Sequence, residues 1–125
     1  MDKNIYKDVK GQSESALQQK IVFWFWNTYP EFRGLLCYNL NNSVGGRRAK
    51  VNQSLGIVKG RSDMVLYIEG KAIMIELKTE KGYQSPTQKK WEVLIASQGF
   101  EYYIIRSLGE FKNLIKVILQ EEQFL

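Results

Sequence analysis

The sequence contains no histidine and only one cysteine, Cys37, among its 125 residues. Without histidine there is no histidine base, no histidine metal ligand and no histidine-activated serine. A single cysteine forms neither an intramolecular disulfide nor a cysteine-cluster zinc site. Its neighbours Leu36 and Tyr38 favour a place in the core over a role as a nucleophile. Any metal site in this chain must therefore be built from oxygen ligands.

Long apolar runs and a secretory leader pattern are also missing. The longest unbroken apolar run, 21–26, is far shorter than the roughly 20 residues of a membrane span. We therefore expect a cytoplasmic protein with no membrane partner. The length suits one domain with a core of its own, so we expect residues 1–125 to form a single domain in which the polar segment 1–12 is flexible.

Acidic residues are absent from the segment 42–62, although the whole chain carries 13 acidic residues against 18 basic ones. The charged residues of this segment are Arg47, Arg48, Lys50, Lys59 and Arg61. They carry as much positive charge as the net +5 of the entire chain. Such a patch favours contact with nucleic-acid phosphates, which holds a backbone without reading its bases. The alternative is an ordinary solvated loop.

Hydrophobic periodicity predicts an α/β fold with a mixed four-stranded sheet flanked by helices, in the order α-β-β-β-α-β-α. A first helix is expected from Ser13 or Ser15 to Pro30, and Ser15 with Gln18 can be read as a capping box. The other expected elements are strands at 35–40, 64–68, 71–78 and 101–106, a short helix at 47–55 after a turn at Gly45-Gly46, and helices capped by Ser85 and Ser107.

The strands 64–68 and 71–78 are joined by Glu69-Gly70, a plausible two-residue hairpin turn. Counting outward from this turn places Asp63 directly opposite Glu76, with Cβ atoms about 4.5–5.5 Å apart. Two carboxylates this close repel unless a cation lies between them, and hard oxygen ligands suit Mg²⁺ or Mn²⁺. Lys78 points the same way as Glu76, because strand side chains alternate faces. The alternative is a set of solvated charges at strand ends.

The opposite face of this hairpin is expected to be core, since it carries Met64, Leu66, Ile68, Ile73, Ile75 and Leu77.

Two polar residues on the expected helices share a face with apolar residues. Glu14 lies three residues before Leu17 and belongs to the inward stripe, although a favourable interaction with the helix dipole is its alternative role. Gln88 shares a face with Trp91 and would point at the sheet, but with Ser85 it also completes a capping box. The two roles of Gln88 are not fully compatible, because one amide cannot both fold back and reach a site.

Together these positions resemble the VRR-NUC domain, a branch of the restriction-endonuclease-like superfamily with a proline-aspartate and glutamate-x-lysine site. Gly60-Arg61-Ser62-Asp63 is similar to the glycine-x-proline-aspartate turn of the family, with Ser62 in place of proline, a change expected to loosen the turn slightly. Glu76-Leu77-Lys78 resembles its glutamate-x-lysine, Glu14 its helix-one glutamate and Gln88 its helical glutamine. The match covers nearly the whole chain and implies a restriction-endonuclease-like core.

The resemblance implies a metal-dependent endonuclease that hydrolyses DNA phosphodiester bonds, often in branched or flapped DNA such as Holliday junctions. Small stand-alone members resemble phage or bacterial proteins, which implies a bacterial cytoplasm as the site of action. The resemblance also implies a homodimer or higher homo-oligomer, because a junction resolvase needs paired active sites. The aromatic run 23–26 supports self-association, since it covers more of a helix than one sheet can bury.

The predicted metal ligands come from the hairpin and the first helix. Asp63 and Glu76 would ligate Mg²⁺ or Mn²⁺, with the backbone carbonyl of Leu77 as a candidate third ligand. Glu14 would act as an outer or water-mediated ligand. One metal ion or two would both satisfy this donor set.

The remaining catalytic roles fall to Lys78 and Gln88. Lys78 would orient the attacking water or stabilise charge developing on the phosphate, and Gln88 would position water or the scissile phosphate. Two other functions stay open: a non-cleaving DNA-binding or scaffold module with a nuclease fold, and an enzyme acting on structured RNA. The basic segment cannot separate them, because phosphate contacts are largely blind to the sugar.

Overall fold

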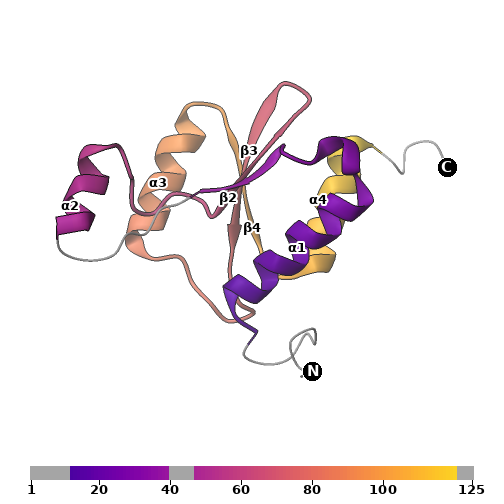
Figure 1. The fold of residues 1–125 in the computed structure, drawn as a ribbon, viewed down its shortest axis with the longest axis horizontal. Helices are drawn as coiled ribbons and strands as arrows, with labels where there is room; N and C mark the ends of the chain where they lie inside the picture. The colour runs from indigo at the N-terminus through magenta and orange to yellow at the C-terminus, as the bar shows by residue number, and fades with distance from the viewer. Residues whose placement is uncertain (1–11, 40–46, 121–125) are drawn as a thin grey trace. The chain divides into compact units, whose positions relative to one another are not determined.

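The computed structural model describes residues 12–39 and 47–120. Its elements are α1 (Glu14–Thr28), the short 3₁₀-helix η2 (Pro30–Phe32), β1 (Leu36–Tyr38), α2 (Arg47–Ser54), β2 (Met64–Ile68), β3 (Lys71–Leu77), α3 (Pro86–Ser97), β4 (Glu101–Ile105) and α4 (Leu108–Leu119) (Figure 1). The predicted turn at Gly45-Gly46 and the predicted flexible segment, apart from Gln12, lie outside the described residues. The order of the main elements is the predicted one.

The described chain divides into two compact units that interleave along the sequence. The first unit holds α1, η2, the segment Leu77–Gly82 and α4. The second holds β1, α2, β2, α3, and all but the last residues of β3 and β4. The expectation of a single domain over 1–125 stays a prediction.

The β2–β3 hairpin has the predicted turn and register. Its antiparallel ladder starts at the pair Ile68–Lys71 beside the turn. The turn residues Glu69 and Gly70 have φ angles of 51° and 75°. Two successive residues with positive φ form a type I′ turn, whose twist matches that of the flanking strands. The register prediction is therefore confirmed.

The sheet has the order β1-β2-β3-β4 and is mixed. β1 pairs antiparallel with β2, and β2 pairs antiparallel with β3. The Lys78 amide donates to the Ile105 carbonyl at 3.1 Å, which brings the C-terminal ends of β3 and β4 together. These two strands therefore run parallel, and α3 provides the crossover that parallel neighbours require. β3 and β4 each end one residue earlier than predicted.

The predicted core face of the hairpin is buried, and near its open end the other face is buried as well. Met64, Ile75 and Leu77 have no exposed surface. On the opposite face Val65 and Met74 are 3% and 8% exposed. A sheet with a parallel pair is commonly covered on both faces, so the strict alternation of half-exposed strands does not hold here. Glu76 shares this face with Met74 and is fully buried too.

Helix α1 begins earlier than the Ser15 capping box would place it. The Oγ of Ser13 accepts the Ala16 amide at 3.0 Å, so Ser13 is the N-cap and Ser15 lies inside the helix. The Ser15–Gln18 capping box is therefore wrong, because a cap must precede the first helical residue. The helix ends at Thr28, two residues before Pro30, as predicted.

Helices α1 and α4 lie side by side in the first unit (Figure 1). The buried Phe111 of α4 meets Trp24 and Phe25 of α1 with ring centroids 6.0 and 6.2 Å apart. The N-cap of α4 is Ser107, as predicted, but the Glu110 carboxylate accepts the amide of Arg106, one residue before the cap. None of the helices within 12–39 and 47–120 is long and apolar enough to cross a membrane.

Gly60 connects the segment before β2 to the start of α3. Its φ is +85°, and a Cβ added there would lie 2.7 Å from the carbonyl oxygen of Thr87. Both the positive φ and the approach of one backbone to another require glycine. Gly70 has a similar φ of +75°, yet a Cβ there would meet nothing within 4 Å.

These two glycines form a matched pair for a stability test. We expect Gly70→Ala to lower the free energy of unfolding by about 1 kcal/mol, the cost of a positive φ. Gly60→Ala adds a collision with backbone and should cost about 3 kcal/mol or more. Urea unfolding of both variants measures the difference. Equal losses would show that Gly60 does not pack against Thr87.

Candidate active site

Asp63 and Glu76 stand opposite one another at the open end of the hairpin. The last ladder pair is Met64–Ile75, and the two carboxylates occupy the next step on each strand. Residues at the same step of an antiparallel pair point to the same face. The carbonyl of Asp63 accepts the Asn39 amide at 2.8 Å, so the backbone of Asp63 is still tied to the strand beside it. Extended by one step, the register gives the two predicted metal ligands the same face of the hairpin, and their role as ligands stays a prediction.

Ser62, where the related motif has proline, is fully buried. Its Oγ donates to the carbonyl of Met64 at 3.0 Å, and its own carbonyl accepts Nδ2 of Asn39 at 3.2 Å. A serine that is hydrogen-bonded on both sides holds the backbone just before Asp63 in place. These hydrogen bonds offset the stiffness that a proline ring would have contributed.

Glu76 is fully buried and is held by a residue that the sequence analysis did not single out. The hydroxyl of Tyr102, on β4, donates to Oε1 of Glu76. Burial and the Glu76 carboxylate raise the pKa of Tyr102 above its usual range, so the phenol stays a hydrogen-bond donor. The sequence predicts the strand 101–106, but its place beside β3 depends on the α3 crossover. Only that placement shows that Tyr102 contacts Glu76.

Gln84 and Trp91 also contact Tyr102. Nε2 of Gln84 lies 3.4 Å from the Tyr102 hydroxyl and 2.9 Å from Oε1 of Glu92. The ring of Trp91 packs against that of Tyr102, with centroids 6.1 Å apart. The loop before α3, helix α3 and strand β4 therefore meet around one phenol. Glu92 and Gln84 carry no motif, and the sequence offers no signal for them.

Lys78 and Glu14 meet in the first unit. Nζ of Lys78 lies 3.8 Å from Oε2 of Glu14, and the Lys78 side chain is 8% exposed against 44% for Glu14. Glu14 reaches this position because Ser13 caps α1 and places Glu14 in its first turn. An interaction with the helix dipole does not require such a partner, so the ion pair favours the inward role of Glu14.

The loop that follows Lys78 is held by Arg106, which also lies in the first unit. Nη1 of Arg106 donates to the carbonyls of Thr79 and Gly82 at 2.8 and 2.9 Å. A guanidinium that bridges two carbonyls fixes the course of the chain between them. Arg106 was expected only as the end of a strand.

Gln88 has its capping role. Its Oε1 accepts the Ser85 amide at 2.8 Å, and the Ser85 Oγ accepts the Gln88 amide at 3.1 Å. This is the predicted capping box of α3, in which Pro86 occupies the first turn. A catalytic role of Gln88 stays a prediction, and it competes with the cap for the same amide.

The basic residues of 42–62 lie in or near α2 and in the segment before β2. Arg47, Arg48 and Lys50 are in α2, with Arg47 and Lys50 exposed. Lys59 is exposed and Arg61 is half-buried, on either side of the glycine that packs against Thr87. The segment between α2 and Asp63 is thus placed against the start of α3.

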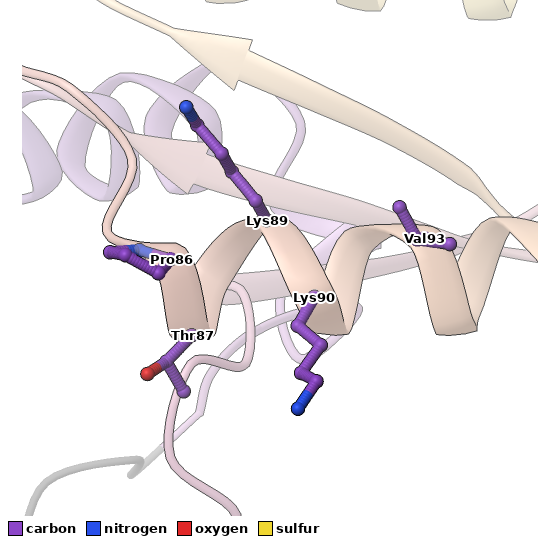
Figure 2. Close-up of a pocket in the computed structure, with 5 residues that line it drawn as sticks. All are labelled: Pro86, Thr87, Lys89, Lys90 and Val93. Carbon is purple, nitrogen blue, oxygen red and sulfur yellow. The ribbon is translucent and has the colours of Figure 1, made fainter.

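Helix α3 adds two lysines that the sequence analysis did not include. Lys89 and Lys90 flank a shallow hollow of about 450 Å³ that Pro86, Thr87 and Val93 also line. Figure 2 shows the two lysine side chains extending to opposite sides of the helix. Neither lysine forms an ion pair with any residue in the described part of the chain. The hollow therefore has an apolar floor between two ammonium groups.

The donor set suits Mg²⁺ or Mn²⁺ when waters complete the coordination, and phosphate oxygens can replace those waters. Within the described ranges, no three His, Cys, Asp or Glu side chains are grouped to hold a metal. Asp63 and Glu76 supply two opposed carboxylates, and the carbonyl of Leu77 follows Glu76 in the chain. Mg²⁺ typically binds one or two carboxylates, keeps several waters and takes further oxygens from phosphate. Two carboxylates are therefore enough for such an ion.

The two roles of Gln88 can be separated by substitution. We expect Gln88→Ala to lower the free energy of unfolding by about 1 kcal/mol, because the capping box is lost. Gln88→Glu keeps an acceptor at the same position and should retain most of that stability. Thermal unfolding and any nuclease activity are measured on both variants. Full stability with lost activity in Gln88→Glu would favour the catalytic role, whereas unchanged stability in Gln88→Ala would contradict the capping role.

Comparison with known proteins bears on the fold of the chain. A solved structure described as a VRR_NUC domain protein superimposes with a TM-score of 0.66 and 21% sequence identity, covering 90% of this chain and 89% of that one. No protein-family model matches the sequence, and no curated protein matches it significantly. At this identity the likeness concerns the fold. The chain therefore has the restriction-endonuclease-like α/β fold of a VRR_NUC domain protein, as the resemblance of its motifs implied.

Proposed function

We propose that this protein is a metal-dependent endonuclease that hydrolyses phosphodiester bonds in DNA, with a preference for branched structures such as Holliday junctions. The observation that carries the proposal is the hairpin register: its last pair is Met64–Ile75, and Asp63 and Glu76 are the next residues at its open end. The fold supports it, since the similar solved structure is described as a VRR_NUC domain protein. Opposed carboxylates with apolar neighbours are costly for folding alone, which favours a functional reason for them.

In this mechanism Asp63 and Glu76 would hold Mg²⁺ or Mn²⁺, with the carbonyl of Leu77 as a candidate further ligand. A bound ion would supply Lewis-acid polarisation of the scissile phosphate and activation of a water. Tyr102 keeps one oxygen of Glu76 in place by its hydrogen bond. The buried carboxylate thus stays oriented without help from the substrate.

Lys78 supplies the positive charge of the mechanism. Its buried ammonium orients the attacking water or stabilises charge on the phosphate as the bond breaks. Glu14 lies 3.8 Å from this ammonium and would direct it, or would serve as an outer, water-mediated ligand. Gln88 would contribute only if its side chain gave up the hydrogen bond with the Ser85 amide.

The DNA backbone is held by the basic residues of the segment 42–62 and by α3. Lys59 and Arg61 flank the glycine that packs on Thr87, and Lys89 and Lys90 lie on the same helix as Thr87. These positions are exposed or half-buried and are therefore accessible to phosphates. Phosphate contacts position the strand, and the shape of the substrate rather than its sequence selects it.

Self-association and a cytoplasmic location complete the proposal. Phe23 is 72% exposed on α1, whereas the three aromatic residues that follow it, 24–26, are buried or half-buried. An exposed aromatic side chain of this kind suits contact with a second copy of the chain. Two copies would supply the paired sites that cutting a four-way junction requires.

Substitution of the opposed carboxylates tests the mechanism. We expect Asp63→Asn or Glu76→Gln to reduce cleavage by about a thousandfold or more, since each removes a charged metal ligand at nearly constant shape. Cleavage of duplex, flap, fork and four-way junction DNA is measured with and without Mn²⁺. Glu80→Gln, an exposed carboxylate in the loop after Lys78, is the matched control and should cut normally.

Cleavage at the wild-type rate by either hairpin variant would reject the proposed roles. A wild-type protein that binds these DNAs and cuts none of them with either ion would instead indicate a non-cleaving scaffold. Cleavage confined to structured RNA in a parallel panel would reassign the substrate.

The salt dependence of DNA binding tests the contribution of α3. Each lysine that contacts a phosphate contributes about 0.9 to the slope of log affinity against log salt on duplex DNA. The double variant Lys89→Ala/Lys90→Ala should therefore lower the slope by up to about 2. Lys71→Ala is the control: it removes one exposed charge at the hairpin turn, where Lys71 faces Glu101 at 3.8 Å. Equal slopes for the double variant and the wild type would remove α3 from the binding surface.

A further inference from the structure

Strand β4 contributes a phenol to a carboxylate that has no exposed surface. The Tyr102 hydroxyl donates to Oε1 of Glu76, which lies at the end of β3. We propose that Tyr102 is a positioning residue for a divalent cation: it fixes the plane of the Glu76 carboxylate by one oxygen, so that the second oxygen is directed at the ion. This inference rests on the proposed function, because it assigns Glu76 to the metal.

The contacts around Tyr102 hold its side chain in one position. Its hydroxyl both donates to Glu76 and lies 3.4 Å from Nε2 of Gln84. The same nitrogen is 2.9 Å from Oε1 of Glu92, so the amide is anchored on α3. Trp91 packs its ring against that of Tyr102 from the same helix. The phenol is thus held at its oxygen and along its ring.

A neutral donor is the appropriate partner for a metal-binding carboxylate. A lysine or arginine at this position would bring a full positive charge beside the ion and would compete with it for Glu76. A phenol donates one hydrogen bond and leaves the negative charge of the carboxylate for the metal. A phenol is neutral near pH 7, so this donor is available under the conditions of the reaction.

Hydrogen-bond partners of metal ligands have a known effect on affinity. Their removal typically weakens metal binding by about 10- to 100-fold, because the ligand loses its orientation. Tyr102→Phe removes only the hydroxyl and keeps the ring that packs against Trp91. We therefore expect the dissociation constant for Mn²⁺ to rise by about 10-fold or more in Tyr102→Phe.

The adjacent residue offers a matched control. Tyr103 is also on β4 and its hydroxyl donates to a carboxylate, Oε1 of Glu101, at 2.5 Å. Glu101 is exposed and is not part of the proposed site. Tyr103→Phe thus deletes the same group from a neighbouring position and should leave the affinity for Mn²⁺ unchanged.

The experiment is titration of the full chain with Mn²⁺ alone, by calorimetry, for the wild type and for Tyr102→Phe, Tyr103→Phe and Gln84→Met. Gln84→Met removes the amide beside the phenol and keeps the test decisive if Tyr102→Phe does not fold; its dissociation constant should rise severalfold. DNA cleavage is then measured against Mn²⁺ concentration. Tyr102→Phe should shift the half-saturating concentration by the same factor as the affinity, and saturating Mn²⁺ should restore most of the rate.

Each outcome has a distinct meaning. Weaker Mn²⁺ binding in Tyr102→Phe and Gln84→Met, with Tyr103→Phe unchanged, supports the positioning role. A wild type that binds Mn²⁺ together with a Tyr102→Phe variant that binds it equally well overturns the inference and leaves the proposed nuclease function intact. A wild type that binds no Mn²⁺ overturns both.

Discussion

The register of the β2–β3 hairpin is the constraint on which the second unit depends. A type I′ turn at Glu69-Gly70 starts a ladder of five pairs that ends at Met64–Ile75. Because side chains alternate with a period of two, a slip of one residue would move every side chain of the slipped strand to the other face. The buried Met64 and Ile75 would then lose their places in the core, and Asp63 would no longer oppose Glu76. The same apolar packing that stabilises the hairpin therefore also aligns the two carboxylates, and no separate interaction is needed to align them.

The burial of Glu76 is the clearest departure from what folding alone would favour. A carboxylate without exposed surface costs free energy unless it is hydrogen-bonded, and Val65 and Met74 on the same face of the hairpin are buried as well. The hydrogen bond from Tyr102 offsets part of this cost. A leucine at position 76 would carry no such cost, so the full burial of this glutamate supports the role proposed for it. A metal ion between Glu76 and Asp63 would offset both the burial and the repulsion.

The features that could be predicted from the sequence are those that depend on residues close together in the chain. The turn at Glu69-Gly70, the register that follows from it and the capping box of Ser85 with Gln88 all depend on residues a few positions apart, and the structure confirms them. Tyr102 and Arg106 could not be assigned in this way. Their partners, Glu76 and Gly82, are more than twenty positions away, and they meet only because α3 crosses over to place β4 beside β3. The sequence does not link Lys89 and Lys90 to the basic segment for a related reason. Only the packing of Gly60 on Thr87 brings that segment to their helix. The Ser13 cap shows the remaining limit. Ser13 and Ser15 lie near the same helix start and offer competing caps, and the folded backbone selects between them.

The segment 60–63 is held by contacts to other parts of the second unit. The related turn uses proline before the aspartate, and a proline ring restricts φ directly. In this chain Ser62 occupies that position, fully buried, with its hydroxyl on the Met64 carbonyl and its own carbonyl on Asn39. Gly60 reaches the backbone of Thr87 at one end of the segment, and the Asp63 carbonyl accepts the Asn39 amide at the other. The backbone is thus restricted at each step by contacts rather than by a ring. Because these contacts depend on Asn39 and Thr87, which come from two other elements, the placement of Asp63 is set by the fold of the second unit as a whole rather than by the tetrapeptide alone.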